Sequence, residues 1–194
     1  MKIPKLNQGL IDTLYGLFAQ KPERFGCRAE GEARITTVSP STWTAVQFDS
    51  IVGNFPEVYD RAAIYSASLS GGPYPIHQGV ANPTRLLVPD PANREMGNLG
   101  GIYQLEAAIA FEADSVGDRE IQIRITRKAG GTVIVAHNAK PAHASKDTFI
   151  ETSTTVWMNP GDYAEVYAWH DASGLLELTP YANYTNIFCM TLLR

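Results

Sequence analysis

Apolar residues recur at two different spacings along the chain, and the first spacing is that of a helix. From about Asn7 to Gln20, apolar residues recur at three- and four-residue spacing, as on one face of a helix. These residues are Leu6, Leu10, Ile11, Leu14, Leu17 and Phe18. Asn7 can cap the start, and Pro22 prevents continuation. Because a helix of about four turns is marginal alone in water, this face must pack on its own domain, on its copies in an oligomer, or on a larger assembly as a docking arm.

From Arg34 onward, apolar and polar residues alternate, which is typical of half-buried strands. In 102–112, the residues on one face are Tyr103, Leu105, Ala107, Ile109 and Phe111. Further strands are expected at 45–51, 84–88, 121–126, 132–137, 149–158, 163–170 and 186–193. Short strands separated by turn residues, with no helices between them, predict an all-β antiparallel sandwich or jelly roll and exclude a parallel α/β sheet.

The strands 121–126 and 132–137 predict a hairpin, in which Gly130-Gly131 supplies the positive φ of a tight turn. A two-residue turn would place Val133 and Val135 away from the isoleucine face of 121–126. Either the loop therefore has three residues, or both faces of the second strand are covered.

We expect two parts along the chain, an N-terminal helical arm at 1–33 and a jelly-roll domain at 34–194. The region 68–91 is rich in proline and glycine and is dominated by loops. It does not resemble a flexible Gly/Ser linker, so it does not separate a further domain.

Five segments, in order, resemble the C1q/TNF-like jelly-roll superfamily. They are Phe48-Asp49-Ser50-Ile51-Val52-Gly53-Asn54 with Tyr59-Asp60, Thr84-Arg85-Leu86-Leu87-Val88-Pro89 with Gly100-Gly101-Ile102-Tyr103, Arg127-Lys128-Ala129-Gly130-Gly131, Met158-Asn159-Pro160-Gly161-Asp162-Tyr163-Ala164-Glu165-Val166, and Tyr184-Thr185-Asn186-Ile187-Phe188-Cys189-Met190-Thr191-Leu192-Leu193. The chain departs from the pattern in a longer, proline-rich 59–84 insertion, and it has no collagen-like Gly-X-Y stalk. These departures argue against a vertebrate complement or hormone role.

The resemblance implies a homotrimer of jelly-roll subunits around a threefold axis. In 163–170, Tyr163, Tyr167 and Trp169 share one face of the strand, and small or branched residues share the other. A bulky aromatic face with polar tips suits a subunit contact, unless it is simply the core. Together with Tyr103, these three residues form the predicted trimer interface.

Charge and hydropathy narrow the range of partners that the chain is expected to bind. The net charge of −4, with no Lys/Arg cluster, argues against nucleic-acid binding. The N-terminus lacks the continuous apolar core of a signal peptide, and no stretch approaches the ~20 apolar residues that span a bilayer, so we expect no membrane span. Cys27 and Cys189 are expected to be reduced thiols, with a disulfide as the alternative.

No motif predicts an enzyme or a cofactor. His77, His137, His143 and His170 lack metal-ligand spacing, and His170 precedes a turn where exposed polar residues are expected. Some C1q-like trimers bind calcium near their axis. The loop carboxylates that such a site would use are Asp114, Asp118, Asp162 and Asp171, although each is equally explained as a turn residue.

Two functions remain. The first is a non-catalytic structural protein of a bacteriophage virion, such as a capsid decoration protein, head fibre or tail-associated trimer, attached through its helical arm to other virion proteins. The second is a lectin-like or C1q-like module that binds a carbohydrate or protein through the 67–98 loops or the trimer apex. In that case Tyr74 and Tyr181 are candidates to stack on sugar.

Overall fold

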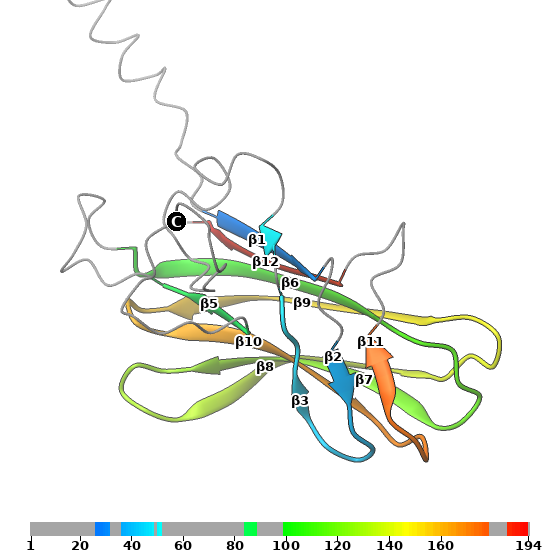
Figure 1. Ribbon diagram of the computed structural model, residues 1–194. Helices are drawn as coiled ribbons and strands as arrows, with labels where there is room; N and C mark the ends of the chain where they lie inside the picture. The colour runs from blue at the N-terminus through cyan, green and yellow to red at the C-terminus, as the bar shows by residue number, and fades with distance from the viewer. Residues whose placement is uncertain are drawn as a thin grey trace, which may run out of the picture.

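A computed structural model describes residues 26–31, 36–48, 50–51, 84–88, 99–178 and 186–193 (Figure 1). Within these ranges the chain forms strands β1 to β12 and no helix. The predicted helix at about 7–20, with its six apolar residues, lies outside the described residues. Residues 26–31, which were assigned to the arm at 1–33, instead form strand β1 and pair with β12 of the larger sheet. No helix in the described ranges has the length and hydropathy to cross a membrane.

The larger of two sheets has seven strands and is built around β6 (Gly101–Phe111). One edge of β6 pairs with β9 (Thr148–Met158). The other edge pairs with β12 (Asn186–Leu192), which is followed by β1 (Gly26–Gly31) and β4 (Ser50–Ile51). At the end of β6, next to Phe111, β11 (Leu176–Leu178) pairs with β6 itself, and β2 (Thr36–Val38) pairs with β11.

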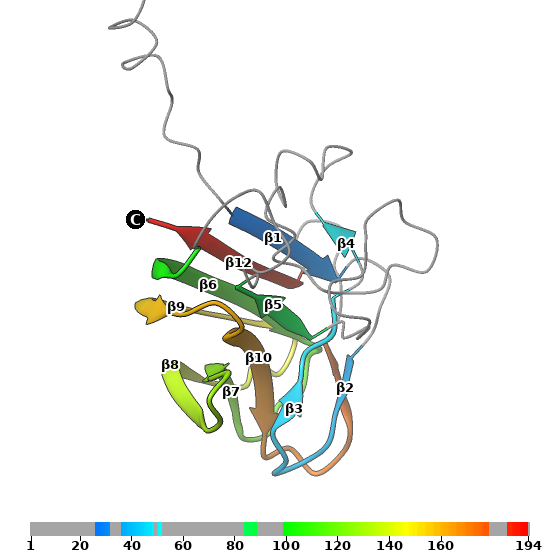
Figure 2. The ribbon, with the colours of Figure 1, turned by 90° about the vertical axis from the view of Figure 1, so that its left-hand side faces the viewer.

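The smaller sheet has five strands and is built around β10 (Tyr163–His170). On one side lie β7 (Asp118–Thr126) and then β8 (Thr132–Pro141). On the other side, β3 (Thr44–Ala45) and β5 (Arg85–Leu87) pair with different parts of β10. The two sheets lie face to face (Figures 1 and 2), and every pairing is antiparallel, which confirms the predicted all-β antiparallel sandwich.

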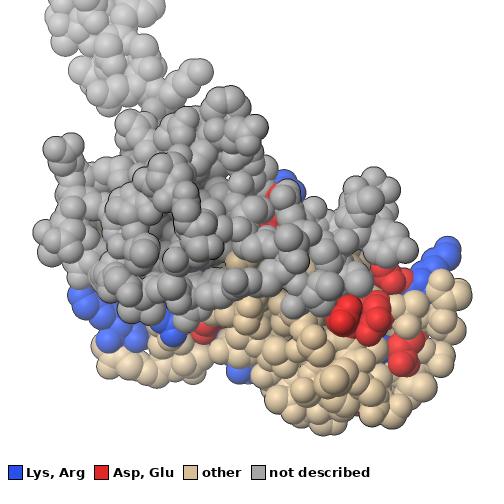
Figure 3. Space-filling view, viewed as in Figure 1, with Lys and Arg blue, Asp and Glu red and all other residues tan. Residues whose placement is uncertain are grey.

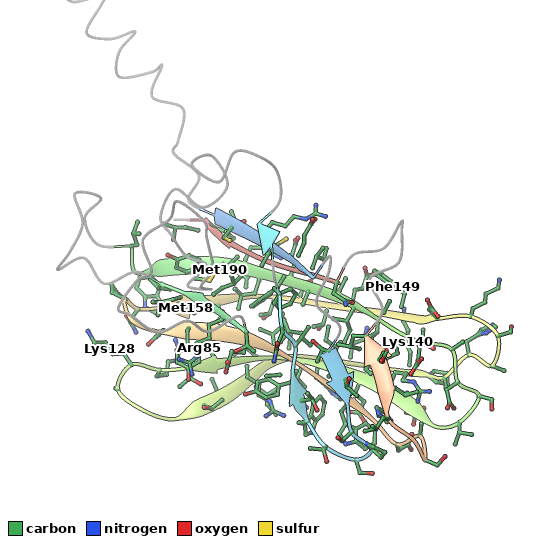
Figure 4. The ribbon with its side chains drawn as sticks, in the orientation of Figure 1. Arg85, Lys128, Lys140, Phe149, Met158 and Met190 are labelled. Atoms are coloured by element: carbon green, nitrogen blue, oxygen red, sulfur yellow. The ribbon has the colours of Figure 1, made fainter. Side chains whose placement is uncertain are left out.

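The core lies between the sheets and follows the alternation of the sequence. In β6, Tyr103, Leu105 and Phe111 have no exposed surface, and in β7 the isoleucines of 121–126 are equally buried. Met158 and Met190 are also fully buried (Figure 4). Each such side chain contributes about 1.5–3 kcal/mol by leaving water, so the inward faces hold the two sheets together.

The β7–β8 hairpin has the three-residue loop that was one of the two predicted alternatives. The Arg127 amide donates to the Gly131 carbonyl oxygen at 3.0 Å, and the Gly130 amide donates to the Arg127 oxygen at 2.9 Å. Gly130 has a φ of +99°, which is the left-handed conformation that this turn requires. Val133 consequently pairs with Ile125 on the isoleucine face.

The edge strands β8 and β9 lie on the same side of the sandwich, where side chains of β8 reach the backbone of β9 (Figure 2). Asn138 Nδ2 donates to the Glu151 carbonyl oxygen at 2.7 Å. Lys140 Nζ donates to the Phe149 carbonyl oxygen at 3.1 Å, at the end of the sandwich where both residues are labelled in Figure 4. These bonds cap carbonyls of an edge strand that would otherwise be open to pairing with another chain.

Candidate functional site

The outward face of the five-stranded sheet carries a cluster of aromatic and charged side chains. We call it the aromatic–arginine face, and it comprises Trp43, Arg85, Glu120, Gln122, Arg124, His137, Tyr163, Glu165, Tyr167 and Trp169. In β10, Ala164, Val166 and Ala168 are fully buried, whereas the aromatic residues of the strand are partly exposed. This confirms the division of the strand predicted from its alternation, with the small residues in the sandwich interior.

Glu165 lies at the centre of the aromatic–arginine face. In the register of the sheet it pairs with Arg85 of β5 on one side and with Arg124 of β7 on the other. Its carboxylate accepts hydrogen bonds from Thr84 Oγ1 at 2.5 Å and from the Tyr167 hydroxyl at 3.3 Å, and Arg85 Nε lies 3.5 Å away. Glu165 is only 8% exposed, so the neighbouring side chains cover it.

Both arginines stack on tyrosine rings. Arg85 Cζ lies 4.0 Å from the centroid of the Tyr163 ring, and Arg124 Cζ lies 4.0 Å from that of Tyr167. Burial raises the pKa of Tyr167, and the nearby Glu165 charge raises it further. Tyr167 therefore stays a neutral hydroxyl donor at physiological pH, and its ring remains a cation–π partner for Arg124.

Trp43 extends the cluster toward the end of β10. Its ring lies 6.2 Å from that of Trp169 at an angle of 34°, and Arg124 Cζ lies 5.1 Å from its centroid. On the neighbouring strands, His137 Nε2 and Glu120 Oε2 are 2.7 Å apart. The face thus combines aromatic rings with guanidinium, amide and carboxylate groups, drawn from β5, β7, β8 and β10 and from Trp43, which directly precedes β3.

The outward face of the seven-stranded sheet has a different character. Trp157 of β9 pairs with Ile102 of β6, and the Leu193 amide donates to the Ile102 oxygen at 2.8 Å. These three side chains are 55%, 39% and 51% exposed, respectively. We call them the apolar row. The next row contains Thr155, Gln104 and Thr191, which are uncharged.

The predicted interface residues do not lie on one surface. Tyr163, Tyr167 and Trp169 belong to the aromatic–arginine face. Tyr103 points into the core with no exposed surface, and its hydroxyl donates to the Leu99 carbonyl oxygen at 2.6 Å. Tyr103 therefore presents no surface to a second subunit. The other candidate residues, Tyr74 and Tyr181, lie outside the described residues.

Arg119 occupies the centre of the acidic loop end of the sandwich. It has no exposed surface, and its Nη1 donates to the Val116 and Asp118 carbonyl oxygens at 2.9 and 3.1 Å. Asp114 lies 3.7 Å from its Nη2, and Asp171 Oδ1 accepts the Asp118 amide at 2.6 Å. The guanidinium thus supplies positive charge among carboxylates proposed for calcium, and the described residues contain no set of three His, Cys, Asp or Glu arranged for a metal.

Asp162 is a structural turn residue. It is 2% exposed, and its carboxylate accepts the amides of Asn159 and Lys128, each at 2.9 Å, and Arg127 Nη1 at 2.8 Å. Burial alone raises the pKa of Asp162, but these hydrogen bonds and the Arg127 charge outweigh burial and hold it below its ordinary value. The ionised carboxylate therefore ties the β7–β8 hairpin to the β9–β10 turn.

His170 is in the core, although a turn position with exposed polar residues was expected for it. The side chain points inward with no exposed surface, and its Nε2 donates to the Val38 carbonyl oxygen at 2.9 Å. The alternation of side chains along β10 explains the difference, because His170 points to the same side of the strand as the buried residues Ala164, Val166 and Ala168.

The two cysteines form no disulfide with each other and face opposite sides of their sheet. Cys27 pairs with Met190, and Arg28 pairs with Cys189, so the cysteines are offset by one residue across β1 and β12. A one-residue offset places side chains on opposite faces. Burial raises the pKa of Cys189 to about 11, which keeps this thiol protonated and unreactive at neutral pH.

Two antiparallel sheets around a shared core, with this strand order, define a jelly-roll β-sandwich. The chain is similar to Eiger TNF from S. frugiperda, with 12% identity over 88% of this chain and 93% of that chain and a TM-score of 0.57. It is also similar to murine APRIL at pH 5.0, with 13% identity over 88% and 99% of the two chains and a TM-score of 0.54. These likenesses show the fold and confirm the predicted TNF-like jelly roll.

A third similar structure is the globular domain of zebrafish complement 1qA protein, with 8% identity over 87% of this chain and 97% of that chain and a TM-score of 0.48. No protein-family model and no curated protein sequence matches the chain.

Proposed function

We propose that the chain is a non-catalytic structural or interaction protein that works as a homotrimer. The apolar row is the observation that carries this proposal. Ile102 and Trp157 lie on adjacent strands, and Leu193 directly follows β12 beside them. The three leave a contiguous apolar surface in water, and such surfaces mark contacts with other proteins. The jelly-roll fold and the sequence resemblance, which implies threefold packing, point to further copies of the same chain as the partner.

The surroundings of the apolar row support burial in a subunit contact. The adjacent row is uncharged, and Thr155 Oγ1 donates to Gln104 Oε1 at 2.8 Å, so these polar groups are partly satisfied within the subunit. Charges begin one row further along the sheet, where Arg28 pairs with Glu30 at 2.9 Å. An uncharged centre with charged groups at the rim is the usual anatomy of a protein interface.

The titratable groups of the described core support a non-catalytic role. Asp162 binds turn amides, Glu165 is covered by Thr84 and Tyr167, and the His170 Nε2 is engaged with a backbone oxygen. A catalytic acid, base or nucleophile has to reach a substrate, whereas these groups form hydrogen bonds that stabilise strands and turns of the protein.

A bacteriophage virion is the setting we propose, with the chain as a capsid decoration protein, head fibre or tail-associated trimer. The helical part of the arm, expected at about 7–20, would dock on another virion protein, because an amphipathic helix needs a partner for its apolar face. Deleting 1–25 should abolish attachment of the trimer to the particle while its mass stays trimeric. Unchanged attachment would contradict the docking role.

Substitution of the apolar row tests the trimer. Trp157→Glu and Ile102→Glu place a charge in the proposed contact, and we expect sedimentation velocity to show mainly monomer for both. Ile134→Glu is the matched control, because Ile134 is 57% exposed but lies on β8 of the other sheet. Trimers that persist in both apolar-row variants, or dissociate equally in the control, would contradict the proposed interface.

A further inference from the structure

One of the two arginines of the aromatic–arginine face is not in contact with a carboxylate. Glu165 is engaged by Thr84, Tyr167 and Arg85, and Glu120 is engaged by His137. Within the described part of the chain, Arg124 forms no ion pair, although it lies beside Glu165 in the register of the sheet. The face therefore presents one guanidinium that no carboxylate of the described residues contacts.

That guanidinium is held in place. Arg124 stacks on Tyr167 at 4.0 Å and faces Trp43 at 5.1 Å, and its Nε donates to Gln122 Oε1 at 3.0 Å. Its two terminal amino groups have no acceptor among the described residues. A guanidinium fixed in this way loses little conformational entropy on binding, and its planar fork matches two oxygens of a carboxylate or sulfate group.

Aromatic rings stand beside this cation. Trp43 and Trp169 form a tilted pair, and both side chains are half-buried rather than enclosed in the core. The negatively polarised face of an indole attracts C–H groups of a flat, partly apolar ligand. The rings thus offer an apolar platform next to a fixed positive charge.

Hydrogen-bonding groups complete the strip. Gln122 pairs with Tyr167 in the register, and Glu120 pairs with Trp169, so both lie next to the aromatic side chains. His137, opposite Gln122 on β8, has a side chain that is 46% exposed. The Glu120 carboxylate and the His137 imidazole at this position can bind hydroxyl groups of a ligand that rests on the rings.

An acidic sugar combines the three properties that this face recognises: apolar C–H faces, a rim of hydroxyl groups and a negative charge. Nucleic acid fits less well, because its backbone needs several cations and the face has one guanidinium without an ion pair. On the face of the molecule visible in Figure 3, basic and acidic atoms of the described residues form small separate groups with uncharged surface between them.

We propose that the aromatic–arginine face binds an acidic glycan, with the carboxylate or sulfate of the sugar on Arg124 and the sugar ring against Trp43 and Trp169. This site goes beyond the proposed trimeric role and does not depend on it, because the apolar row is on the other sheet. Arg85, labelled in Figure 4, is already stacked on Tyr163 and paired with Glu165, so it borders the site.

The first test uses the full chain and an array of immobilised glycans that pairs each carboxylated or sulfated sugar with its uncharged counterpart. We expect binding to acidic glycans and not to their uncharged counterparts, with weaker binding at high salt. The carboxylated and sulfated arms identify which anion is bound. Absence of binding to every acidic glycan, or equal binding to the uncharged counterparts, would overturn the proposal.

The second test measures the affinity of site variants for the best acidic glycan of the array by calorimetry. Arg124→Gln should weaken binding about tenfold or more, because it removes a charge-assisted bidentate contact. Arg124→Lys keeps the charge but loses the fork, so it should bind less tightly than wild type and more tightly than Arg124→Gln. Trp169→Ala should also weaken binding, because it removes part of the platform.

Lys146→Gln is the matched control, since it removes one positive charge from the exposed β8–β9 turn. It should bind like wild type. Unfolding temperature and sedimentation of every variant check that fold and subunit number are preserved. Wild-type affinity in Arg124→Gln overturns the proposal, as does a loss of oligomer in that variant without any change in glycan affinity, which would make the face a subunit contact.

Discussion

The Asp162 carboxylate shows how one residue holds two turns together. An unfolded aspartate titrates near pH 3.9, whereas hydrogen bonds from Asn159, Lys128 and Arg127 lower the pKa of folded Asp162. Ionised Asp162 therefore stabilises the fold above about pH 4, and this contribution is lost as pH falls through the folded pKa. Asp162→Asn should lose about 1.5–3 kcal/mol of unfolding free energy at pH 7.

Chemical denaturation of wild type and Asp162→Asn from pH 7 to pH 2.5 measures this contribution. The difference between them should shrink below about pH 4, as wild-type Asp162 becomes protonated. Glu151→Gln, at an exposed position of β9, is the control and should leave the pH dependence unchanged. A pH-independent difference for Asp162→Asn would show that its charge does not contribute.

At the scale of the element, the turn of the β7–β8 hairpin depends on the positive φ of Gly130. Gly130 has a φ of +99°, and a Cβ added there would meet no atom within 4 Å, so the cost of Gly130→Ala is conformational strain alone. We expect a loss of about 1–2 kcal/mol. Gly174→Ala, at an equally open position without positive φ, should be neutral or slightly stabilising. Equal stabilities in thermal unfolding would contradict the assigned turn.

Strand existence and the inward faces were predictable, because burial on one side of a sheet imposes a period of two on each strand. The alternation of β6 and β10 shows this directly. The aromatic–arginine face was not predictable, because Trp43, Arg85 and Arg124 come from distant segments of the chain whose register no local pattern reveals. The alternation of Arg124 with isoleucines did indicate that its side chain faces outward. It did not indicate Trp43 and Tyr167 as neighbours.

For the whole molecule, the jelly-roll sandwich explains why two outward faces carry different chemistry. The seven-stranded sheet offers the apolar row, and the five-stranded sheet offers the aromatic–arginine face. The aromatic side chains of β10 indicated a contact surface, but sequence alone could not decide between a subunit and another ligand. The apolar row combines Ile102 of β6, Trp157 of β9 and Leu193 just after β12, so its contiguity likewise emerges only from the fold.

The mass of the protein in solution tests the central claim most directly. Sedimentation equilibrium of the full chain, at micromolar concentrations and physiological salt, gives this mass without reference to shape. For a chain of 21.2 kDa, the homotrimer predicts three times that mass. A mass of 21.2 kDa at every concentration would contradict the proposed trimer and the role of the apolar row as its contact.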